Sequence, residues 1–433
     1  MQSTLHDRVH RLNSAGFRND AEYVLYCCRV NRRVDWNHAL AYAVELANER
    51  VLPVLFYEDL EDSNAQANSR HHAFVVDGVE GTAKRCRHLG IGYQFCGSSV
   101  DQLVRSAAAV VTDDHPNSNF PAILDVASFA VDSSCIVPMR QIAKREYAAY
   151  TIRPKIHKLL PRYLRPVPEL RVQRRWPGEP VIAPVPTSRD VPPSTAFRGG
   201  SDAARERLRH FLKEGLRRYA ELRNQPSAHA TSNLSPYLHF GHISPLEIAL
   251  AASKANDFLE ELIVRRELAF NFARFSADPA SIANLPDWAR ETLQEHADDE
   301  RNPLYTREQF EHAQTHDPLW NAAQKEMLLR GKIHGYYRMY WGKKILEWSR
   351  TPQEAVETMA YIHDVWALDG HDPATYANIL WCLGLHDRPW PERPIFGKVR
   401  YMSFDGMKRK TDVDAYVSEI EHLERTVEDP LRL

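Results

Sequence analysis

The sequence predicts an α/β domain built on a doubly wound parallel sheet, followed by an all-α domain. Three observations lead to this fold class. The chain has 433 residues, which is long for one hydrophobic core. Between residues 20 and 140, short apolar runs alternate with helical stretches of 10–20 residues, as in a parallel sheet with crossover helices. Beyond about residue 200 the apolar residues recur at helical spacing almost throughout.

The elements of the first domain follow from these runs. Continuous apolar segments of three to seven residues predict buried strands. They lie at residues 24–28, 51–57, 91–95, 109–112 and 135–137. Apolar residues at helical spacing predict helices at residues 36–49, 70–89 and 100–108. Ligands of such sheets usually bind beyond the carboxyl ends of the strands, but neither a G-x-G-x-x-G motif nor a Walker loop accompanies these strands.

A proline-rich segment separates the two domains. Ten prolines lie between Pro154 and Pro193, together with many arginines. Proline removes a backbone donor and restricts the residue before it, so we expect an extended connector on the surface. Three helices are predicted beyond it, at residues 203–221, 259–275 and 353–361. The expected domains are an α/β domain over 1–145, an extended Pro/Arg-rich linker over 146–200 and a helical domain over 201–433.

Composition excludes several classes of protein. Hydrophobic residues make up 43% and charged residues 26%, which is ordinary for a globular chain, and the net charge of −2 gives no global basic signature. The six cysteines show no disulfide or zinc-type spacing, so we expect no metal. No apolar run approaches the roughly 18–20 residues of a membrane span, and the N-terminus lacks the apolar core of a signal peptide. We expect a cytoplasmic monomer without a membrane partner.

Tryptophans are concentrated in one part of the chain. Six of the nine lie within the 71 residues from Trp320 to Trp390. Trp341 and Trp348 are seven residues apart, about two helical turns, so a continuous helix would place both indoles on one face. This pattern is typical of an aromatic helical core, but it also suits a series of indoles that passes electrons to a bound cofactor. The spacing alone does not decide between them.

Three further groups of residues are candidates for binding. Ser235 precedes Pro236, and this pair predicts a helix start with serine as the N-cap, or a phosphate site at that helix start. Arg338 and Asp369 would fix a polar heterocycle only if both line one cavity. The basic residues Lys398, Arg400, Lys408 and Arg409 are interleaved with Tyr401 and Phe404, which is typical either of a solvated face or of phosphate contacts beside a base-stacking surface.

Several long motifs resemble one family. They lie at residues 32–40, 231–241, 261–268, 316–324, 335–348 and 392–402. In consistent order over about residues 20–416, they are similar to the class II branch of the photolyase/cryptochrome family. The resemblance implies an N-terminal antenna-type domain and a helical domain that holds FAD. In the DNA-repairing members, excited reduced flavin donates an electron to a cyclobutane pyrimidine dimer that has been flipped from the duplex.

The resemblance also assigns roles to individual residues. It implies an electron-transfer series of Trp341, Trp320 and Trp348, and a lesion pocket of Glu267, Met339 and Trp381, with Glu267 protonated through burial. It implies a flavin pocket of Tyr219, Thr231, Ser232, Leu234, Ser235, Leu238, Arg338, His363 and Asp369. Lys398 and Arg400 would contact the DNA backbone, and Lys408 and Arg409 would add to that surface.

The chain departs from the branch pattern at four positions. His363 stands where the branch usually has Asn facing flavin N5. His242 and Glu247 replace the usual Gln and Arg at the DNA groove, where a glutamate would repel phosphate. Ala374 lies in a variant of the usual Asp-Pro-Asn-Gly-Tyr motif.

These observations predict a light-driven enzyme that repairs cyclobutane pyrimidine dimers in UV-damaged DNA with FAD. The alternative is a photolyase-like blue-light receptor or redox flavoprotein with little or no dimer repair, which His363 and Glu247 favour. A deazaflavin-type antenna chromophore in the N-terminal domain is a further possibility that no short motif reports.

Overall fold

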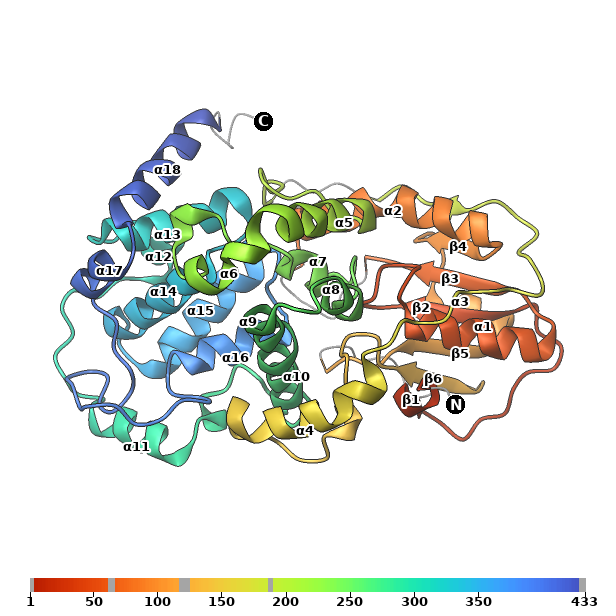
Figure 1. The fold of residues 1–433 in the computed structure, drawn as a ribbon, viewed down its shortest axis with the longest axis horizontal. Coiled ribbons are helices and arrows are strands. Elements are labelled where there is room, and N and C mark those ends of the chain that lie inside the picture. Colours follow the sequence, from red (N-terminus) through yellow and green to blue (C-terminus); the bar gives the residue numbers. More distant parts are fainter. Residues whose placement is uncertain (1–3, 61–66, 117–124, 186–189, 428–433) are drawn as a thin grey trace.

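A computed structural model describes residues 4–60, 67–116, 125–185 and 190–427. An α/β part and a helical part lie side by side along the long axis of the molecule (Figure 1). The predicted fold class is confirmed. The strands are β1 (Val9–Arg11), β2 (Tyr23–Cys28), β3 (Val54–Glu58), β4 (Gly92–Phe95), β5 (Ala107–Asp113), β6 (Ser128–Val131) and β7 (Val181–Ile182).

The strands form one sheet in the order β1-β6-β5-β2-β3-β4-β7. All neighbours are parallel except β1 and β6, which pair antiparallel at the edge. The chain starts winding at the central β2, moves outward through β3 and β4, and returns to the other side of β2 at β5. This is the doubly wound arrangement expected from the alternation of strands and helices. Every residue of β2, β3, β5 and β6 is buried, which explains their continuous apolar runs.

Two details of the predicted sheet are wrong. Residues 135–137 are buried, as their apolar character requires, but they form a loop and not a strand. The sixth strand is β6, seven residues earlier, and the edge strands β1 and β7 were not predicted. An apolar run reports burial, whereas a strand also needs a neighbouring backbone with which to pair.

The proline-rich segment is not extended throughout, contrary to prediction. Residues Ala149–Tyr163 form α4, with Pro154 and Pro161 inside the helix. Ile152 and Ile156 are fully buried on its inner face, and this burial outweighs the backbone hydrogen bonds that the prolines remove. Figure 1 shows α4 running beneath the junction of the two parts. Residues 186–189 lie outside the described residues, and we keep the boundaries at 145 and 200 as a proposal.

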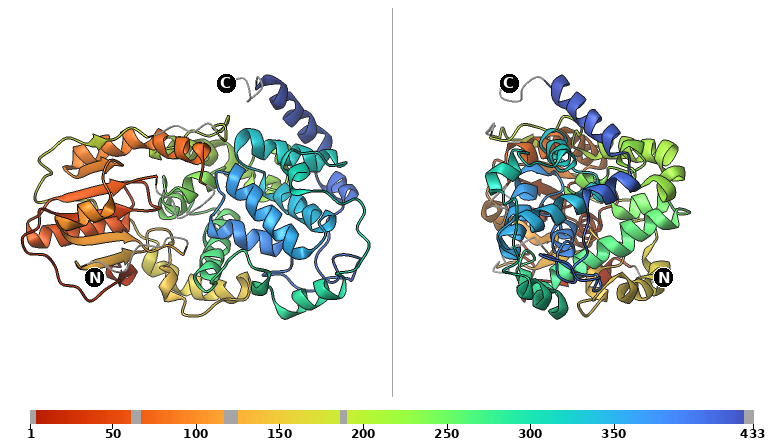
Figure 2. Two further views of the ribbon diagram at one scale, coloured as in Figure 1. Left: turned by 180° about the vertical axis from the view of Figure 1, so that it is seen from behind. Right: turned by 90° about the vertical axis from the view of Figure 1, so that its left-hand side faces the viewer.

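The remaining helices cover the sheet or build the second part. Figure 2 shows the helical part from behind and end-on, with α18 projecting from it. The helices beside the sheet are α1 (His38–Arg50), α2 (Ser69–Leu89) and α3 (Val100–Arg105). The helical part contains α5 (Ser201–His210), α6 (Leu216–Leu222), α7 (Ser235–His239), α8 (Pro245–Ala251), α9 (Asn256–Leu259), α10 (Arg266–Arg274), α11 (Asp287–Glu295), α12 (Arg307–Glu311), α13 (Pro318–Arg330), α14 (Gly335–Trp348), α15 (Pro352–Trp366), α16 (Pro373–Trp381), α17 (Phe404–Lys410) and α18 (Val413–Thr426). Two π-helical turns, Phe211–Gly215 and Glu260–Arg265, lie within otherwise continuous helical segments.

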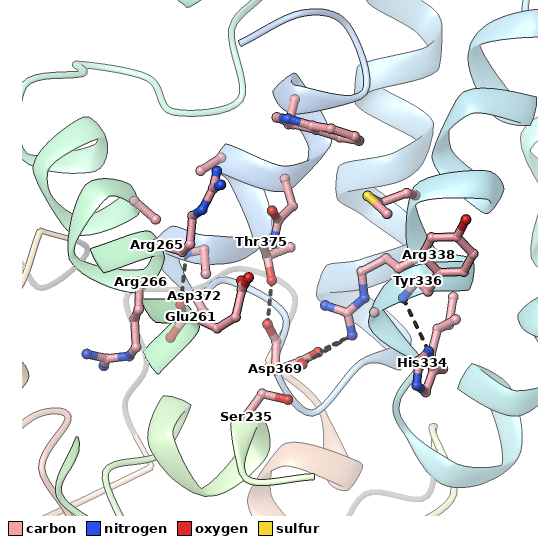
Figure 3. Close-up of a pocket in the computed structure, with 18 of the residues that line it drawn as sticks. Ser235, Glu261, Arg265, Arg266, His334, Tyr336, Arg338, Asp369, Asp372 and Thr375 are labelled. Atoms are coloured by element: carbon pink, nitrogen blue, oxygen red, sulfur yellow. Dashed lines mark hydrogen bonds and ion pairs between the residues drawn. The ribbon is translucent and has the colours of Figure 1, made fainter. Parts of the chain in front are cut away.

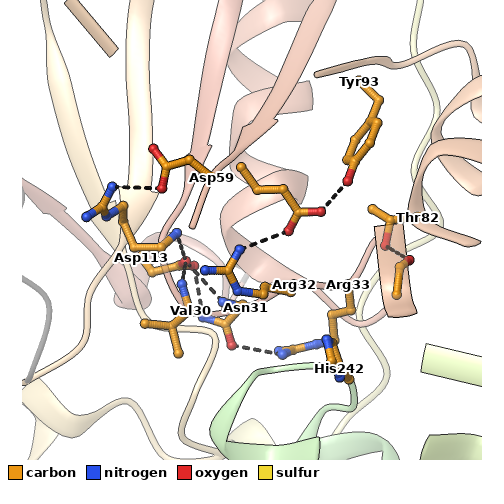
Figure 4. Close-up of polar contacts among 12 residues, drawn as sticks. Val30, Asn31, Arg32, Arg33, Asp59, Thr82, Tyr93, Asp113 and His242 are labelled. Atoms are coloured by element: carbon orange, nitrogen blue, oxygen red, sulfur yellow. Dashed lines mark hydrogen bonds and ion pairs between the residues drawn. The ribbon is translucent and has the colours of Figure 1, made fainter. Parts of the chain in front are cut away.

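A buried polar network at the carboxyl ends of the strands joins the two parts (Figure 4). Asp113, at the end of β5, accepts hydrogen bonds from three successive backbone amides, those of residues 29–31. This network holds Arg33, whose guanidinium donates to the carbonyl of Gly241 in the helical part at 3.0 Å and to that of Ser133 at 2.7 Å. Gly241 has a φ of +66°, and a Cβ there would lie 2.2 Å from the carbonyl oxygen of Val30. The close contact between the two parts therefore requires glycine.

No helix among the described residues is long and apolar enough to cross a membrane. In the same part of the chain, no three His, Cys, Asp or Glu side chains gather as they would around a metal ion.

Candidate active site

A cavity of about 660 Å³ lies inside the helical part (Figure 3). Its walls come from α7, α10, α14, α15 and α16, together with the π-helical turn Glu260–Arg265 and the loop before α7. Thirteen of the residues assigned from the resemblance line this one cavity, although they are spread over 182 residues of sequence. They are Tyr219, Thr231, Ser232, Leu234, Ser235, Leu238, Arg338, Met339, Trp341, His363, Asp369, Trp381 and Arg400. Their convergence makes this cavity the candidate active site.

Arg338 and Asp369 form an ion pair in the wall of the cavity. Arg338 Nη2 donates to both oxygens of Asp369, at 2.9 and 3.1 Å (Figure 3). Burial by itself would raise the pKa of Asp369, but the charges of Arg338 and Lys332 outweigh it and hold that pKa well below its usual range. The carboxylate is therefore charged at any ordinary pH. Both side chains line one cavity, which is the condition under which this pair would fix a polar heterocycle.

Ser235 is not an N-cap, contrary to prediction. It is the first residue of α7, the preceding Leu234 occupies the cap position, and no side chain caps the helix. The Ser235 hydroxyl instead hydrogen-bonds Asp369, and it lies beside that carboxylate in Figure 3. Ser235 therefore ties α7 to the ion pair of the cavity.

His363 presents one nitrogen to the cavity. Its Nδ1 lies 2.9 Å from the carbonyl oxygen of Met359, so this nitrogen carries the proton. Burial and then the charge of Arg338 lower the pKa of His363 to about 3, which keeps the ring neutral. The Nε2 atom is buried and has no partner among the described residues. The residue is therefore a neutral hydrogen-bond acceptor at the cavity wall.

Three tryptophans lead away from the cavity. Trp341, on α14, lines the cavity and is fully buried, and its indole is nearly parallel to that of Trp320 on α13, with centroids 6.0 Å apart. Trp320 contacts Trp348, at the end of α14, at 6.3 Å. As expected, α14 is continuous from Trp341 to Trp348, but Trp320 lies between the two indoles. Trp348 in turn contacts Tyr305 and the exposed His316.

Hydrogen bonds hold two of these indoles in place. Asp317 caps α13 by accepting from the backbone amide of Trp320 at 2.9 Å. The Nε1 of Trp320 donates to the carbonyl of Trp341 at 3.0 Å, and the Nε1 of Trp341 donates to Gln324 at 2.9 Å. Gln324 is completely buried, and spacing alone did not single it out.

Glu267 does not line the cavity, contrary to the role that the resemblance implied. It is buried, and its Oε1 accepts from the backbone amides of Ile136 and Val137, at 2.7 and 3.2 Å, in the α/β part. Burial raises the pKa of Glu267 to about 8, so its side chain is protonated at neutral pH as expected, but it lies outside the cavity. The glutamate that lines the cavity is Glu261, which accepts from Arg223 at 2.8 Å.

The helical geometry explains this error. Glu261 and Glu267 both lie in the motif at residues 261–268, and regular helical spacing gives no reason to expect one of them in the cavity rather than the other. Residues Glu260–Arg265 form a π-helical turn, which shifts every later side chain around the axis relative to a regular helix. Which carboxylate faces the cavity is therefore not readable from the spacing.

His242 and Glu247 do not form a groove for DNA, contrary to prediction. His242 is buried where the two parts meet, and its Nδ1 accepts from the backbone amide of Gly200 at 3.0 Å. Burial lowers the pKa of His242 to about 3, so the ring is neutral. Glu247 is held by Arg205 at 2.8 Å, and neither residue lines the cavity. The fourth departure, Ala374, does line the cavity, and its backbone amide donates to Asp372, which caps α16.

The four basic residues assigned to DNA lie in different places. Arg400 lines the cavity, with its guanidinium carbon 5.7 Å from the ring centre of Trp381 and 4.7 Å from that of Trp390. Lys398 is exposed two residues earlier in the chain. Lys408 and Arg409 are exposed on α17 and border a separate depression of about 440 Å³.

Comparisons with known proteins find relatives along nearly the whole chain. No family model matches the chain. A deoxyribodipyrimidine photo-lyase from Methanothermobacter thermautotrophicus is 42% identical over 440 residues, covering 96% of this chain and 98% of the relative. One from Oryza sativa subsp. japonica is 40% identical over 460 residues, covering 96% and 90%.

A solved structure gives the same result for the fold. The class III photolyase of Agrobacterium tumefaciens superposes with a TM-score of 0.71 at 16% identity, covering 97% of this chain and 91% of that one. Sequence identity of about 40% along nearly the whole chain, with the same architecture, identifies the relationship. The chain belongs to the photolyase/cryptochrome family, among the deoxyribodipyrimidine photolyases.

Proposed function

We propose that this chain is a light-driven lyase that splits cyclobutane pyrimidine dimers in DNA with FAD as its cofactor. The observation that carries the proposal is the 42% identity to a named photolyase along 96% of the chain. The motif residues at 231–241 and 335–348 support a place in the class II branch, and both segments contribute to the cavity wall.

The cavity suits FAD in size and chemistry. Its volume of about 660 Å³ lies within the range of roughly 300–1,000 Å³ typical of ligand pockets. Two buried atoms on its wall, Arg338 Nε and His363 Nε2, have no partner among the described residues. One is a donor and the other an acceptor, and an isoalloxazine ring offers both carbonyl oxygens and N–H groups. Buried polar groups of this kind are costly unless a ligand satisfies them.

Nine residues would hold the cofactor. Tyr219, Thr231, Ser232, Leu234, Ser235 and Leu238, from α6, α7 and the loop before α7, would enclose it, and Arg338, His363 and Asp369 would face its ring. When bound and reduced, FAD supplies an electron donor that is excited by light. The task of the protein is to exclude water, orient the ring and admit the lesion.

Trp381 and Met339 would receive the flipped dimer. Both line the cavity and are partly exposed, so they offer an apolar wall at its mouth. Flipping costs least for a damaged base that is already poorly stacked, which contributes to selectivity. We assign to Glu261 the carboxylate role that the resemblance gave to Glu267, since Glu261 is on the cavity wall and is not used by the Arg338–Asp369 pair.

Basic residues would position the DNA strand around the mouth. Arg400 is the one of the four predicted DNA-binding residues that lines the cavity, and Lys398 is exposed close to it in sequence. Lys408 and Arg409 on α17 would extend the surface. Phosphate contacts of this kind supply affinity that falls with salt.

Trp341, Trp320 and Trp348 would resupply electrons to the cofactor. Their ring centres are separated by 6.0 and 6.3 Å along the series, which starts at the cavity and ends beside Tyr305 and His316. Such short separations suit stepwise electron transfer from solution through the indoles.

The blue-light receptor remains the second candidate, on the strength of His363 alone. The predicted repulsion of phosphate by Glu247 no longer supports it, since that carboxylate is bound by Arg205 away from the cavity. His242 is likewise internal. Dimer repair is therefore the better supported of the two.

Three further assignments belong to this proposal. We propose that the protein acts as a monomer. We also propose that it works in the cytoplasm, because none of its six cysteines forms a disulfide in the described chain. We also propose a deazaflavin-type antenna chromophore in the α/β part, and the absorbance spectrum of the purified protein would show it beside that of FAD.

The repair reaction can be measured directly. Purified protein with reduced FAD is mixed with an oligonucleotide that carries one thymine dimer and is illuminated at blue to near-ultraviolet wavelengths. We expect light-dependent recovery of thymine absorbance, with no change in a dark sample or with an undamaged oligonucleotide. Absence of recovery from protein that binds and photoreduces FAD would reject dimer repair and leave the receptor candidate.

A further inference from the structure

Two tryptophans line the cavity, and their surroundings differ in charge. Trp341 donates its Nε1–H to the neutral amide of Gln324 at 2.9 Å and meets the edge of His363, with ring centres 4.8 Å apart. Trp381, at the end of α16, has two cations beside it. Lys343 Nζ lies 5.3 Å from its ring centre, and the guanidinium carbon of Arg400 lies at 5.7 Å. Among the described residues, no cation is recorded at such a distance from Trp341.

Neither cation beside Trp381 forms an ion pair among the described residues, although the Asp387 carboxylate acts on Lys343 from nearby. Lys343 is completely buried on α14, and its Nζ donates to the carbonyl of Cys382 at 2.6 Å. No ion pair of Lys343 or Arg400 is recorded within the described part of the chain. The neighbouring Lys344 differs, because its Nζ is paired with Glu347 at 2.6 Å although it also lies near an indole, that of Trp348.

Lys343 is charged at neutral pH. Burial lowers its pKa to about 8, while the nearby Asp387 opposes this shift and Arg400 adds to it. Most of the protein therefore carries the ammonium at pH 7.

A positive charge beside an indole makes that indole harder to oxidise. An electron that leaves the ring leaves a radical cation, which the nearby positive charges repel. The same cation attracts the neutral ring through its quadrupole and so stabilises the starting state. Both effects act in the same direction.

The two indoles also differ in what lies behind them. Trp341 is followed by Trp320 and Trp348, so a positive charge on Trp341 can move away from the cavity. Among the described residues, no ring contact links Trp381 to another indole. An electron taken from Trp381 would therefore return to it, and the absorbed photon would be wasted.

We propose that Lys343 and Arg400 raise the oxidation potential of Trp381, so that the excited oxidised flavin takes its electron from Trp341. The proposal rests on the proposed function, because it requires FAD in the cavity. The suppressed step moves one electron from the Trp381 indole to the excited flavin, without breaking a bond or moving a proton. Lys343 and Arg400 are positioning residues in this account, since they act through Trp381.

The test follows the excited state of bound, oxidised FAD in a Trp341→Phe background, where the normal donor is absent. Transient absorption measures the lifetime of this state and any indole radical. Adding Lys343→Met should shorten the lifetime by at least about twofold and produce an indole radical signal. Adding Trp381→Phe to that variant should restore the long lifetime. Lys344→Met, which removes the neighbouring, compensated charge, should leave the lifetime unchanged.

A second substitution covers a failure of Lys343→Met to fold. Arg400 is partly exposed, so its replacement is less disruptive to folding. Arg400→Gln should shorten the lifetime in the same way, while Lys343→Arg should retain the long lifetime. An unchanged lifetime in Lys343→Met or Arg400→Gln with FAD bound would overturn the proposal, as would a shortened lifetime that persists after Trp381→Phe. Flavin absorbance is read first, and protein that retains no FAD would refute the proposed function instead.

Discussion

The proposed functions of the cavity depend on individual side chains in its wall. Trp341 is the indole at the cavity wall, and the other two members of the series lie behind it. Replacing it with Phe removes the oxidisable ring but keeps an aromatic side chain in the core. We expect Trp341→Phe to retain FAD and to lose its photoreduction.

The measurement is the loss of oxidised-flavin absorbance under blue light with an external reductant. Trp288→Phe is the matched control, since Trp288 lies outside the cavity and should photoreduce normally. Normal photoreduction of the Trp341→Phe protein would reject the assignment of the electron-transfer series.

His363 departs from the branch pattern and lines the cavity. Its Nε2 can only accept, because its Nδ1–H is directed at the Met359 carbonyl. If this acceptor faces N5, as the resemblance implies, it stabilises the reduced ring, in which N5 carries a proton. We expect His363→Leu to make the two-electron midpoint potential of bound FAD more negative by roughly 20–30 mV, the equivalent of one hydrogen bond.

Redox titration of the two proteins gives this difference directly. An unchanged potential in a variant that still binds FAD would show that Nε2 does not contact N5–H.

At the scale of secondary-structure elements, the contact of two loops connects the two parts of the chain. Gly241 follows α7 and meets residues 30 and 31 in the loop after β2. We expect Gly241→Ala to cost at least about 2–3 kcal/mol, because the new Cβ would clash with backbone atoms and the φ of +66° disfavours alanine. Thermal unfolding measures this loss.

Gly16→Ala serves as the control for that substitution. A Cβ at Gly16 would have no heavy atom within 4 Å, so its unfolding temperature should change little. Equal stability of the two variants would contradict the requirement for glycine at position 241.

On the scale of the whole molecule, Glu267 couples stability to pH. Its pKa is about 8 in the folded chain against an ordinary value of 4.5, so the folded state retains a proton that the unfolded state releases. The stability contributed by this group is complete below pH 4.5 and is lost as pH rises towards 8. Glu267→Gln keeps an oxygen acceptor for the two amides but cannot ionise.

We therefore expect Glu267→Gln to match the parent protein near pH 5 and to exceed its stability increasingly up to pH 8. The gain should be about 1 kcal/mol per pH unit. Denaturant unfolding at several pH values measures it, with Glu291→Gln on the exposed side of α11 as the control. A constant difference between variant and parent across this range would show that Glu267 is already ionised in the folded protein.

The sequence by itself determined the fold class, the order of the main strands and helices, and most of the cavity. Alternating apolar runs and helical spacing report burial, and burial fixes which residues face a core. The long motifs carried the family resemblance, and with it the positions of Arg338, Asp369, His363 and Trp341. The convergence of these side chains on one cavity was expected, because the resemblance placed Arg338, His363 and Asp369 at the flavin and Trp341 in the electron-transfer series beside it.

Only the tertiary structure decided where several individual side chains point. The π-helical turn Glu260–Arg265 rotates the later residues, so Glu261 faces the cavity and Glu267 faces the α/β part. Residues 149–163 form a helix because their apolar face finds a core, which outweighs the cost of two prolines. His242 and Glu247 are internal because the two parts of the chain meet there. In each case the outcome depends on a partner distant in sequence, and local spacing contains no information about that partner.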